Sequence, residues 1–354
     1  MDFLADILTA LWFGIPIWAW CGFTIFIVGL LALDLGLFHR TAHEVGFAES
    51  LKMAAFYVAI AIAFGVVVWW LYYVHPPAYS LDPAIKNAIS DSQRAWAAVQ
   101  LYYTGYIIEY TLAIDNVFVI GLVFTYFAVP RALQHRVLFW GILGVIVLRG
   151  VMIGLGAVLI SEFYGILYVF AAFLIFTGIK MLRPSNEEWD IGDNRAIRFL
   201  RRHLRVTDGF HSSRFFVRLP DERSGKVVSY ATPLFIALVS IELVDVIFAV
   251  DSVPAIFAIT QEPFIIFTSN IFAIIGLRTL FFTLAATVHR FHYLKYALAL
   301  ILIFIGAKIF IGDFVFAGKV PAVLSLSVTL GLIIGGILYS LWRTRSDIKK
   351  SVEP

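Results

Sequence analysis

The chain has 354 residues, of which 61% are hydrophobic and only 14% are charged, and its mean hydropathy is +0.88. Soluble proteins carry about 25% charged residues, so this composition excludes a soluble globular protein and indicates a polytopic membrane protein. The net charge of +3 is small and implies no nucleic-acid partner. The single cysteine, Cys21, cannot form an internal disulfide.

Long apolar runs follow one another along the whole chain. Each meets or exceeds the roughly 20 residues that a helix needs to cross a bilayer. The sequence therefore predicts an all-α membrane protein with nine transmembrane helices. The predicted helices cover residues 17–38, 53–74, 97–127, 132–160, 163–182, 231–259, 264–288, 293–316 and 320–342.

The distribution of lysine and arginine predicts the orientation. Short cytoplasmic loops carry an excess of these residues, and with the N-terminus outside, twenty of the 27 cations fall on the cytoplasmic side. We therefore expect a multi-pass protein of the plasma membrane, the inner membrane of a bacterium, with its N-terminus outside and its C-terminus in the cytoplasm. The first residues include Asp2 and Asp6 but no cation, so they lack the basic region of a signal peptide and the first helix is expected to be retained.

Two similar acidic motifs lie inside predicted helices. Glu109 and Asp115 are separated by five apolar or small residues, and so are Asp245 and Asp251. A charged side chain at the centre of a bilayer costs about 2.5–3.5 kcal/mol on insertion scales, so acids in such positions are functional by default. Glu242, three residues before Asp245, adds a third acid to the second copy on a nearby helix face.

The two motifs belong to a longer repeat. Arg149 and Lys180 follow the first motif, and Arg278 and Lys308 follow the second, with spacings of 31 and 30 residues. Each unit holds three helices, so the two units must enter the membrane from opposite sides, which predicts a 3+3 inverted repeat of the kind found in secondary transporters. The expected divisions are two N-terminal helices in 1–96, the first repeat in 97–182, a cytoplasmic basic loop in 183–230, the second repeat in 231–316, and the ninth helix with a cytoplasmic tail in 317–354.

The spacing within the motifs leaves two geometries open. Six residues of helix place Glu109 and Asp115 about 120° apart, so they do not share a helix face. Either the helix is interrupted, for which Gly105 and Pro254 are candidate positions, or the carboxylates act at successive stations along a path. Carboxylate, amide and carbonyl oxygens suit hard cations such as Mg²⁺, Ca²⁺ or Mn²⁺, and the acids could also carry protons in exchange.

Several strings in the chain closely resemble the TerC family of membrane proteins. The clearest are Ile108-Glu-Tyr-Thr-Leu-Ala-Ile-Asp-Asn116 and Ile241-Glu-Leu-Val-Asp-Val-Ile-Phe-Ala-Val-Asp-Ser252, and the likeness covers nearly the whole chain. The family is named for tellurium resistance and has bacterial members that export Mn²⁺. The resemblance implies export of Mn²⁺ or a related hard divalent cation by alternating access, with no permanently bound cofactor. It implies an ion-binding set made of Glu109, Asp115, Asn116, Asp245, Asp251 and Ser252.

Other interpretations of the same residues remain. Asp115 and Asp251 could form structural ion pairs with Arg149 and Arg278, and these arginines are assigned to charge balance or gating rather than to direct contact with the ion. Asp34 marks either the inner exit of the ion or an interfacial position. The alternative functions are a non-transporting scaffold or assembly factor and a tellurium-stress protein; no enzymatic activity is predicted, and a homo-oligomer is left open.

The segment 183–230 holds the one sizeable polar stretch. Residues 195–206 alternate apolar residues with arginines, which predicts a basic amphipathic helix at the inner leaflet. Residues 215–219 and 226–230 flank a turn-forming stretch that includes Pro220 and Gly225, and this pattern predicts a β-hairpin.

Overall fold

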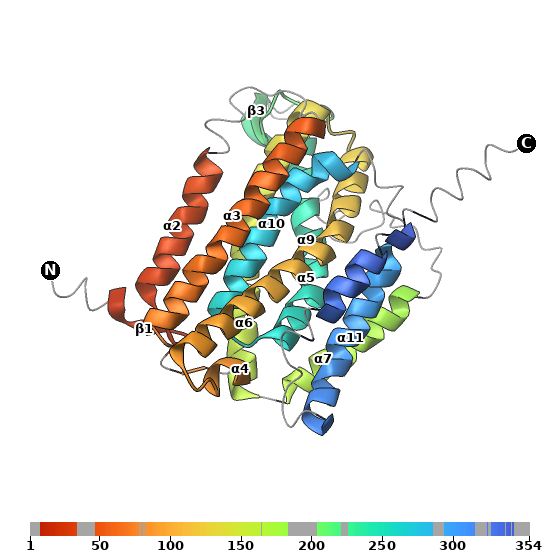
Figure 1. Ribbon diagram of the computed structural model, residues 1–354. Helices are drawn as coiled ribbons and strands as arrows, with labels where there is room; N and C mark the ends of the chain where they lie inside the picture. The colour runs from red at the N-terminus through yellow and green to blue at the C-terminus, as the bar shows by residue number, and fades with distance from the viewer. Residues whose placement is uncertain are drawn as a thin grey trace, which may run out of the picture.

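The computed structural model describes residues 8–33, 47–77, 79–80, 82–163, 165–182, 204–220, 226–285, 294–315, 324, 327–336, 338–340 and 342. Within these ranges the protein is a bundle of helices with two small hairpins (Figure 1). The helices are α2 (Ile17–Leu33), α3 (Phe47–Val74), α4 (Pro83–Lys86), α5 (Asp91–Tyr126), α6 (Arg131–Glu162), α7 (Ile166–Leu182), α9 (Pro233–Ile259), α10 (Pro263–Ala285) and α11 (Leu294–Val315). The strands are β1 (Leu11–Trp12), β2 (Ile15–Pro16), β3 (Phe216–Pro220) and β4 (Val227–Ala231).

The helices carry the composition of membrane spans. Within the described part of the chain, three helical segments are long and apolar enough to cross a bilayer, namely Ala48–Val74, Arg131–Glu162 and Pro233–Val250, and several others are apolar but shorter. Large apolar side chains also lie on the outside of the bundle, as Val147, Val151 and Leu155 do along one side of α6. An exposed apolar surface of this kind suits lipid rather than water. The protein is therefore a multi-pass membrane protein.

Helices occur at eight of the nine predicted spans, with ends that differ by a few residues. Ser90 caps α5 by accepting a hydrogen bond from the backbone of Gln93, and Pro233 opens α9 at a position where a missing backbone donor costs nothing. The ninth predicted span lies partly outside the described residues, and its described part between Ser327 and Ser340 is helical. The count of nine spans stays a prediction.

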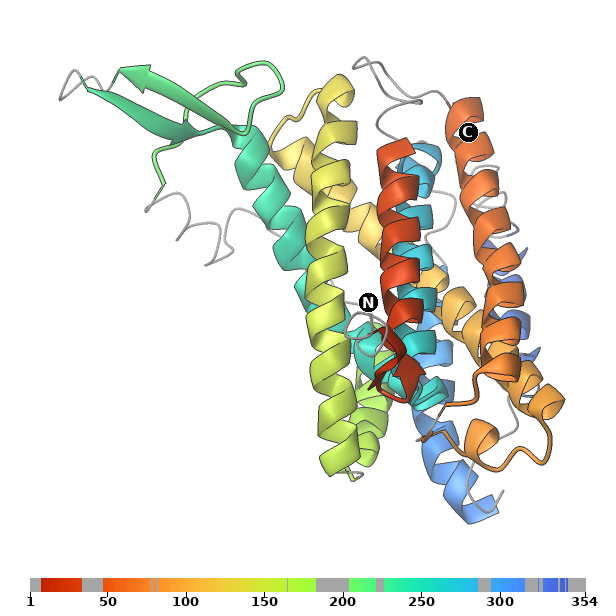
Figure 2. The same ribbon diagram turned by 90° about the vertical axis from the view of Figure 1, so that its left-hand side faces the viewer.

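The helices pack in a connected arrangement around α5, α9 and α10. Helix α5 packs against α3, α9 and α10, helix α6 packs against α9, and α7 packs against α11. Two tyrosines fasten α5 to α3. The buried Tyr102 and the partly exposed Tyr103 donate hydrogen bonds to the carbonyls of Ala61 and Ile62 at 2.9 and 2.6 Å. The acid-bearing helices α5 and α9 therefore pack directly against each other in the bundle (Figures 1 and 2).

The contact between α7 and α11 is reciprocal. A Cβ on Gly178 would lie 2.7 Å from the carbonyl oxygen of Ala299 and 2.6 Å from Ile303, and a Cβ on Gly306 would lie 2.6 Å from the carbonyl oxygen of Ala171 and 2.8 Å from Ile175. Each glycine thus contacts the backbone of the other helix at residues three and seven positions before the other glycine. Only glycine permits this approach, and the order of the contacts shows that α7 and α11 are antiparallel.

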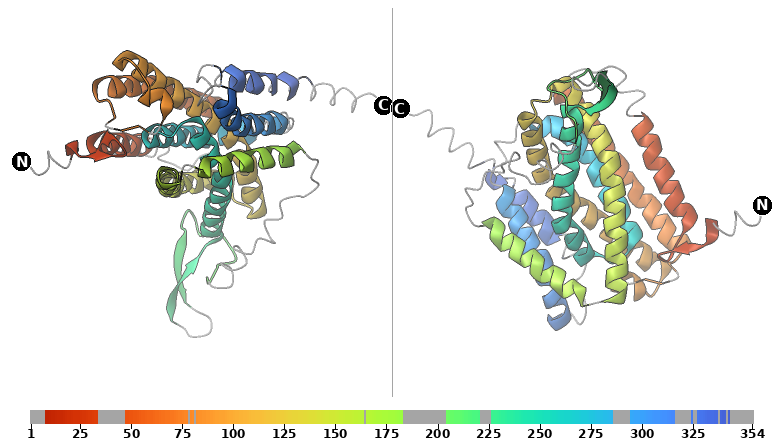
Figure 3. Two further views of the ribbon diagram at one scale, coloured as in Figure 1. Left: turned by 90° about the horizontal axis from the view of Figure 1, so that it is seen from below. Right: turned by 180° about the vertical axis from the view of Figure 1, so that it is seen from behind.

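A β-hairpin projects from one end of the bundle. Strands β3 and β4 pair antiparallel, with Phe216 opposite Ala231, and β4 leads into α9 (Figures 2 and 3). This confirms the hairpin that the sequence predicts, whereas the predicted basic helix over 195–206 lies almost entirely outside the described residues. We call this the hairpin end; α4 lies at the opposite end, which we call the α4 end (Figure 1).

Candidate functional site

A buried arginine joins three helices in the middle of the bundle. Arg149 on α6 is 1% exposed. Its Nη1 donates to Glu109 Oε1 on α5 at 2.5 Å and to Ser252 Oγ on α9 at 2.8 Å. Its Nη2 and Nε donate to the two carboxylate oxygens of Asp245, also on α9, at 3.1 and 3.2 Å. The guanidinium thus forms a two-pronged pair with one acid and a single bond with another.

The charges in this cluster do not balance within the cluster itself. Glu109 and Asp245 are 2% and 8% exposed, and together they face one guanidinium. When both acids are ionised, one negative charge is left over in a place with little access to water. An uncompensated buried charge is costly, so the cluster favours a further positive charge, either a proton or a metal cation.

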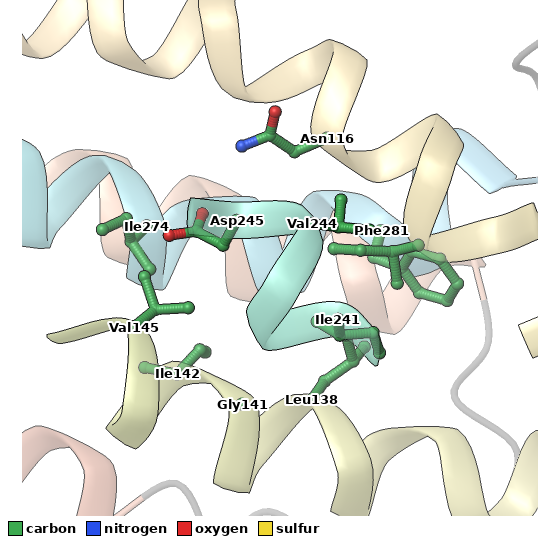
Figure 4. Close-up of a pocket in the computed structure, with 11 residues that line it drawn as sticks. Asn116, Leu138, Gly141, Ile142, Val145, Ile241, Val244, Asp245, Ile274 and Phe281 are labelled. Carbon is green, nitrogen blue, oxygen red and sulfur yellow. The ribbon is translucent and has the colours of Figure 1, made fainter. Parts of the chain in front are cut away.

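A small cavity adjoins Asp245. It encloses about 40 Å³, which is room for a few water-sized particles. Asn116 on α5 and Asp245 on α9 face it from two sides (Figure 4). The rest of the lining is apolar, from α5, α6, α9 and α10: Ile120, Leu138, Gly141, Ile142, Val145, Ile241, Val244, Ile274 and Phe281.

The cavity lies on the hairpin side of Arg149. Its α6 residues all precede Arg149, and α6 begins near the hairpin, where Arg136 and Trp140 contact the ring of Phe215. Glu242 also lies on this side. Its carboxyl group packs against Gly144, where any side chain would collide with it, and its Oε2 is buried without a hydrogen-bond partner in the described part of the chain.

A second buried carboxylate group lies at the α4 end. Glu262, between α9 and α10, accepts hydrogen bonds from the hydroxyl groups of Ser80 and Tyr72. Asp82 accepts from the backbone of Ala84 at 3.0 Å and of Gln261 at 3.2 Å. Burial raises the pKa of Glu262 to about 7, and the nearby charge of Asp82 adds to the rise. This group joins the segment before α4 to the turn between α9 and α10.

Comparison with known proteins identifies the family. Residues 94–348 match the integral membrane protein TerC family. The chain belongs to the TerC family. No solved structure matches it.

Several similar proteins match this chain over nearly their full length. A protein of Escherichia coli O6:H1 named putative membrane-bound redox modulator Alx is 44% identical over 341 residues, which is 96% of this chain and 99% of the relative. An uncharacterised membrane protein of Myxococcus xanthus is 42% identical and covers 92% of each chain. An uncharacterised membrane protein of Rickettsia bellii is 44% identical over 92% of this chain and 97% of its own.

The structure brings several of the predicted site residues of this TerC-family chain together. Glu109, Asp245 and Ser252 meet at Arg149, and Asn116 faces the cavity beside Asp245, with Glu242 near the same side. Helices α5 and α9 run without interruption through both motifs. The interrupted helix, one of the two geometries left open by the spacing, is therefore not what the structure shows, and successive stations along a path stay a prediction.

The remaining predicted residues lie outside what the structure describes. Asp115, Asp251 and Arg278 fall within α5, α9 and α10, but their side chains are among those not described, and Asp34 lies in the undescribed segment 34–46. Over the described side chains, no group of three or more histidine, cysteine, aspartate or glutamate residues is arranged to hold a metal ion. Among the described side chains, the acidic partners of the Arg149 guanidinium are Glu109 and Asp245. The alternative pairing of Arg149 with Asp115 stays a prediction, because the side chain of Asp115 is not described.

Sequence reasoning missed Asn270 on α10. Its side chain is fully buried, and its amide faces the carboxyl group of Glu109. A polar amide in a mainly apolar helix gives a weak signal, since asparagine carries no charge and the acids on the other helices dominate the pattern. The buried pair of Asp82 and Glu262 was also missed, because both lie in connections, where acids are normally solvated.

Proposed function

We propose that this protein moves a hard divalent cation, with Mn²⁺ as the first candidate, across the membrane through the site around Asp245. The supporting observation is the buried set of two carboxylates against one guanidinium, next to a cavity that Asn116 and Asp245 face. Oxygen ligands of this kind suit Mn²⁺, Mg²⁺ or Ca²⁺.

Arg149 gives the proposed transport a simple physical basis. In the empty state its guanidinium occupies the carboxylates, so that the acids are not left unpaired in the membrane. An entering divalent cation competes with this tethered charge for Asp245. The ion then replaces contacts that the arginine gives up. With both acids ionised, the cluster carries one net negative charge without the ion and one net positive charge with it, so its charge inside the membrane stays small in both states.

The proposed architecture is an inverted 3+3 repeat with α5, α6 and α7 in one half and α9, α10 and α11 in the other. The reciprocal glycine contact supports it, because Gly178 and Gly306 occupy matching positions in the two halves and each receives the other helix. When two helices contact each other through equivalent residues, each glycine meeting the equivalent part of the other helix, the two helices are related by a two-fold axis. In transporters built this way, the substrate site lies at mid-membrane between the halves.

Flux through purified protein tests the proposal. Mn²⁺ entry into proteoliposomes, followed by an internal fluorescent chelator, should be seen with wild-type protein and lost in Asp245→Asn. Glu162→Gln removes one acid from an exposed helix end and should leave the flux unchanged. No Mn²⁺, Ca²⁺ or Mg²⁺ flux with folded wild-type protein would refute the proposal.

A second candidate is a membrane scaffold in which the acids serve as structural partners of Arg149. It is favoured by the four hydrogen bonds that the guanidinium donates to Glu109, Asp245 and Ser252. The two candidates differ in Arg149→Gln, which leaves two buried carboxylates unpaired and should cost about 3–5 kcal/mol of stability. If the site binds cations, millimolar Mn²⁺ should recover a large part of the lost melting temperature; a scaffold gains nothing from the ion.

The relatives' name suggests a role in redox balance for those proteins. In this chain such a role cannot come from an internal dithiol pair, because Cys21 is the single cysteine. Cation movement that alters the redox state of the cell is compatible with that name and with the site described above.

A further inference from the structure

Two facing side chains between α5 and α10 hold polar atoms without partners. Glu109 gives one carboxylate oxygen to Arg149, and its other oxygen, Oε2, is buried with no hydrogen bond among the described residues. Asn270 is 0% exposed, and neither its Oδ1 nor its Nδ2 has a hydrogen-bond partner there. The amide lies close enough to the Glu109 carboxyl group for a polar interaction, but no atom pair between them meets the full distance and angle geometry of a hydrogen bond.

Such an arrangement calls for an explanation. Buried polar groups in native proteins are nearly always hydrogen-bonded, and those that are not often mark an ion, a water molecule or a functional strain. Here three unpartnered atoms belong to two side chains that face each other. The hydroxyl group of Tyr106, one turn before Glu109 on α5, also lacks a partner. An apolar side chain of similar size at position 270 would have avoided the cost of burying an amide.

The position of Asn270 separates it from the cavity beside Asp245. Helix α10 begins at the α4 end, because the turn before it contacts Asp82. Asn270 is seven residues into that helix, or about 10 Å along its axis. The cavity, by contrast, is lined by residues on the hairpin side of Arg149. The guanidinium therefore lies between the cavity on one side and the pair of Glu109 Oε2 and Asn270 on the other.

We propose that Glu109 Oε2 and the carbonyl oxygen of Asn270 form a second station for the cation, on the α4 side of Arg149. The inference rests on the proposed function. It adds Asn270 as a protein ligand of the cation and a second binding position that the cation occupies on its way through the protein. The ion occupies one station beside Asp245 and Asn116 and another beside Glu109 and Asn270. Arg149 separates the two and must shift for the ion to pass. A carboxylate and an amide carbonyl are ligands of a hard divalent cation.

Mn²⁺ binding to the purified full-length protein in detergent tests this station. Free Mn²⁺ gives a six-line electron paramagnetic resonance signal that disappears on binding, which yields an affinity without any transport assay. Asn270→Leu should weaken Mn²⁺ binding at least tenfold. The same variant should melt at a temperature equal to or above that of the wild type, because it removes an unpartnered buried amide. Asn270→Asp should bind Mn²⁺ at least as tightly as the wild type.

Thr268→Val is the matched control. Thr268 is a buried polar residue of the same helix, but its hydroxyl group is bonded to the carbonyl of Phe264 within α10 at 2.8 Å, so the variant should bind Mn²⁺ like the wild type. Unchanged binding in a folded Asn270→Leu would mean that these oxygens hold water, and would overturn the inference while leaving the transport proposal intact. If Asn270→Leu fails to fold, weaker binding in Asn270→Asp overturns it. Absence of Mn²⁺ binding in the wild type would instead count against the transport proposal.

Discussion

At the scale of single residues, several charged side chains are buried, and each of them has a polar or charged partner. Arg149 meets Glu109 and Asp245 at one site, and Glu262 lies with Ser80 and Tyr72 at another. The two sites differ in the groups that face the acid. Around Arg149 the carboxylates face a fixed cation, whereas Glu262 accepts hydrogen bonds from neutral donors and lies near a second acid.

Glu262 makes the stability of the protein depend on pH. Its pKa rises from 4.5 to about 7 on folding, chiefly through burial, so the folded state holds the proton more tightly than the unfolded state. The resulting stabilisation is complete below pH 4.5 and is lost as the pH rises through 7, and it amounts to on the order of 3 kcal/mol. The melting temperature in detergent should therefore fall between pH 5 and pH 8.

Glu262→Gln should abolish most of that fall, because the amide is neutral at every pH. Glu162→Gln is its control, since Glu162 is an exposed acid at the end of α6 and should keep the wild-type pH profile. An equally steep profile in Glu262→Gln would show that another group is responsible.

At the scale of helices, α7 and α11 approach each other closely at two points, Gly178 and Gly306, where a side chain larger than that of glycine would not fit. Gly178→Ala and Gly306→Ala each place a methyl group within 2.7 Å of a backbone oxygen, and backbone atoms cannot rotate out of the way. Each substitution should cost about 1–3 kcal/mol, as overpacking in a core does, and lower the melting temperature by several degrees. Because both changes force the same two helices apart, the double variant should lose less than the sum of the single losses.

Gly154→Ala is the matched control on α6, where an added methyl group meets no atom within 4 Å. It should be neutral or stabilising by up to about 1 kcal/mol, from helix propensity alone. Equal losses at Gly154 and at Gly178 would show that the close contact between α7 and α11 does not limit stability.

Much of this level of structure could be predicted from the sequence, for reasons that particular residues make clear. The long apolar runs predicted helices because lipid leaves few other choices, and Glu109 and Asp245 could be found because a charge inside such a run has a high cost. The partners of Arg149 could not, because the spacing along one chain does not say which helix lies opposite. Lys180 and Lys308 show the same limit. They occupy matching positions in the repeat, but Lys180 is exposed whereas Lys308 is buried, with 9% of its surface exposed.

At the scale of the whole molecule, the orientation in the membrane remains a prediction. Ile89, next to α4, is 94% exposed, and Lys226, at the start of β4, is exposed at the opposite end. In a Cys21→Ser background, a membrane-impermeant maleimide added to intact cells should label Ile89→Cys and spare Lys226→Cys. Both should be labelled once the membrane is opened. The reverse pattern in intact cells would place the N-terminus in the cytoplasm.

The bonds of Asp82 and Glu262 also have a mechanical consequence. They fasten the turn between α9 and α10 to the stretch of chain that connects α3 with α5. If the two halves move relative to each other during transport, this turn cannot move independently, because the bonds of Glu262 to Tyr72 on α3 and to Ser80 restrain it. Such a movement would then require either that α3 moves together with the turn or that these bonds break and form again, so α3 would take part in the conformational change.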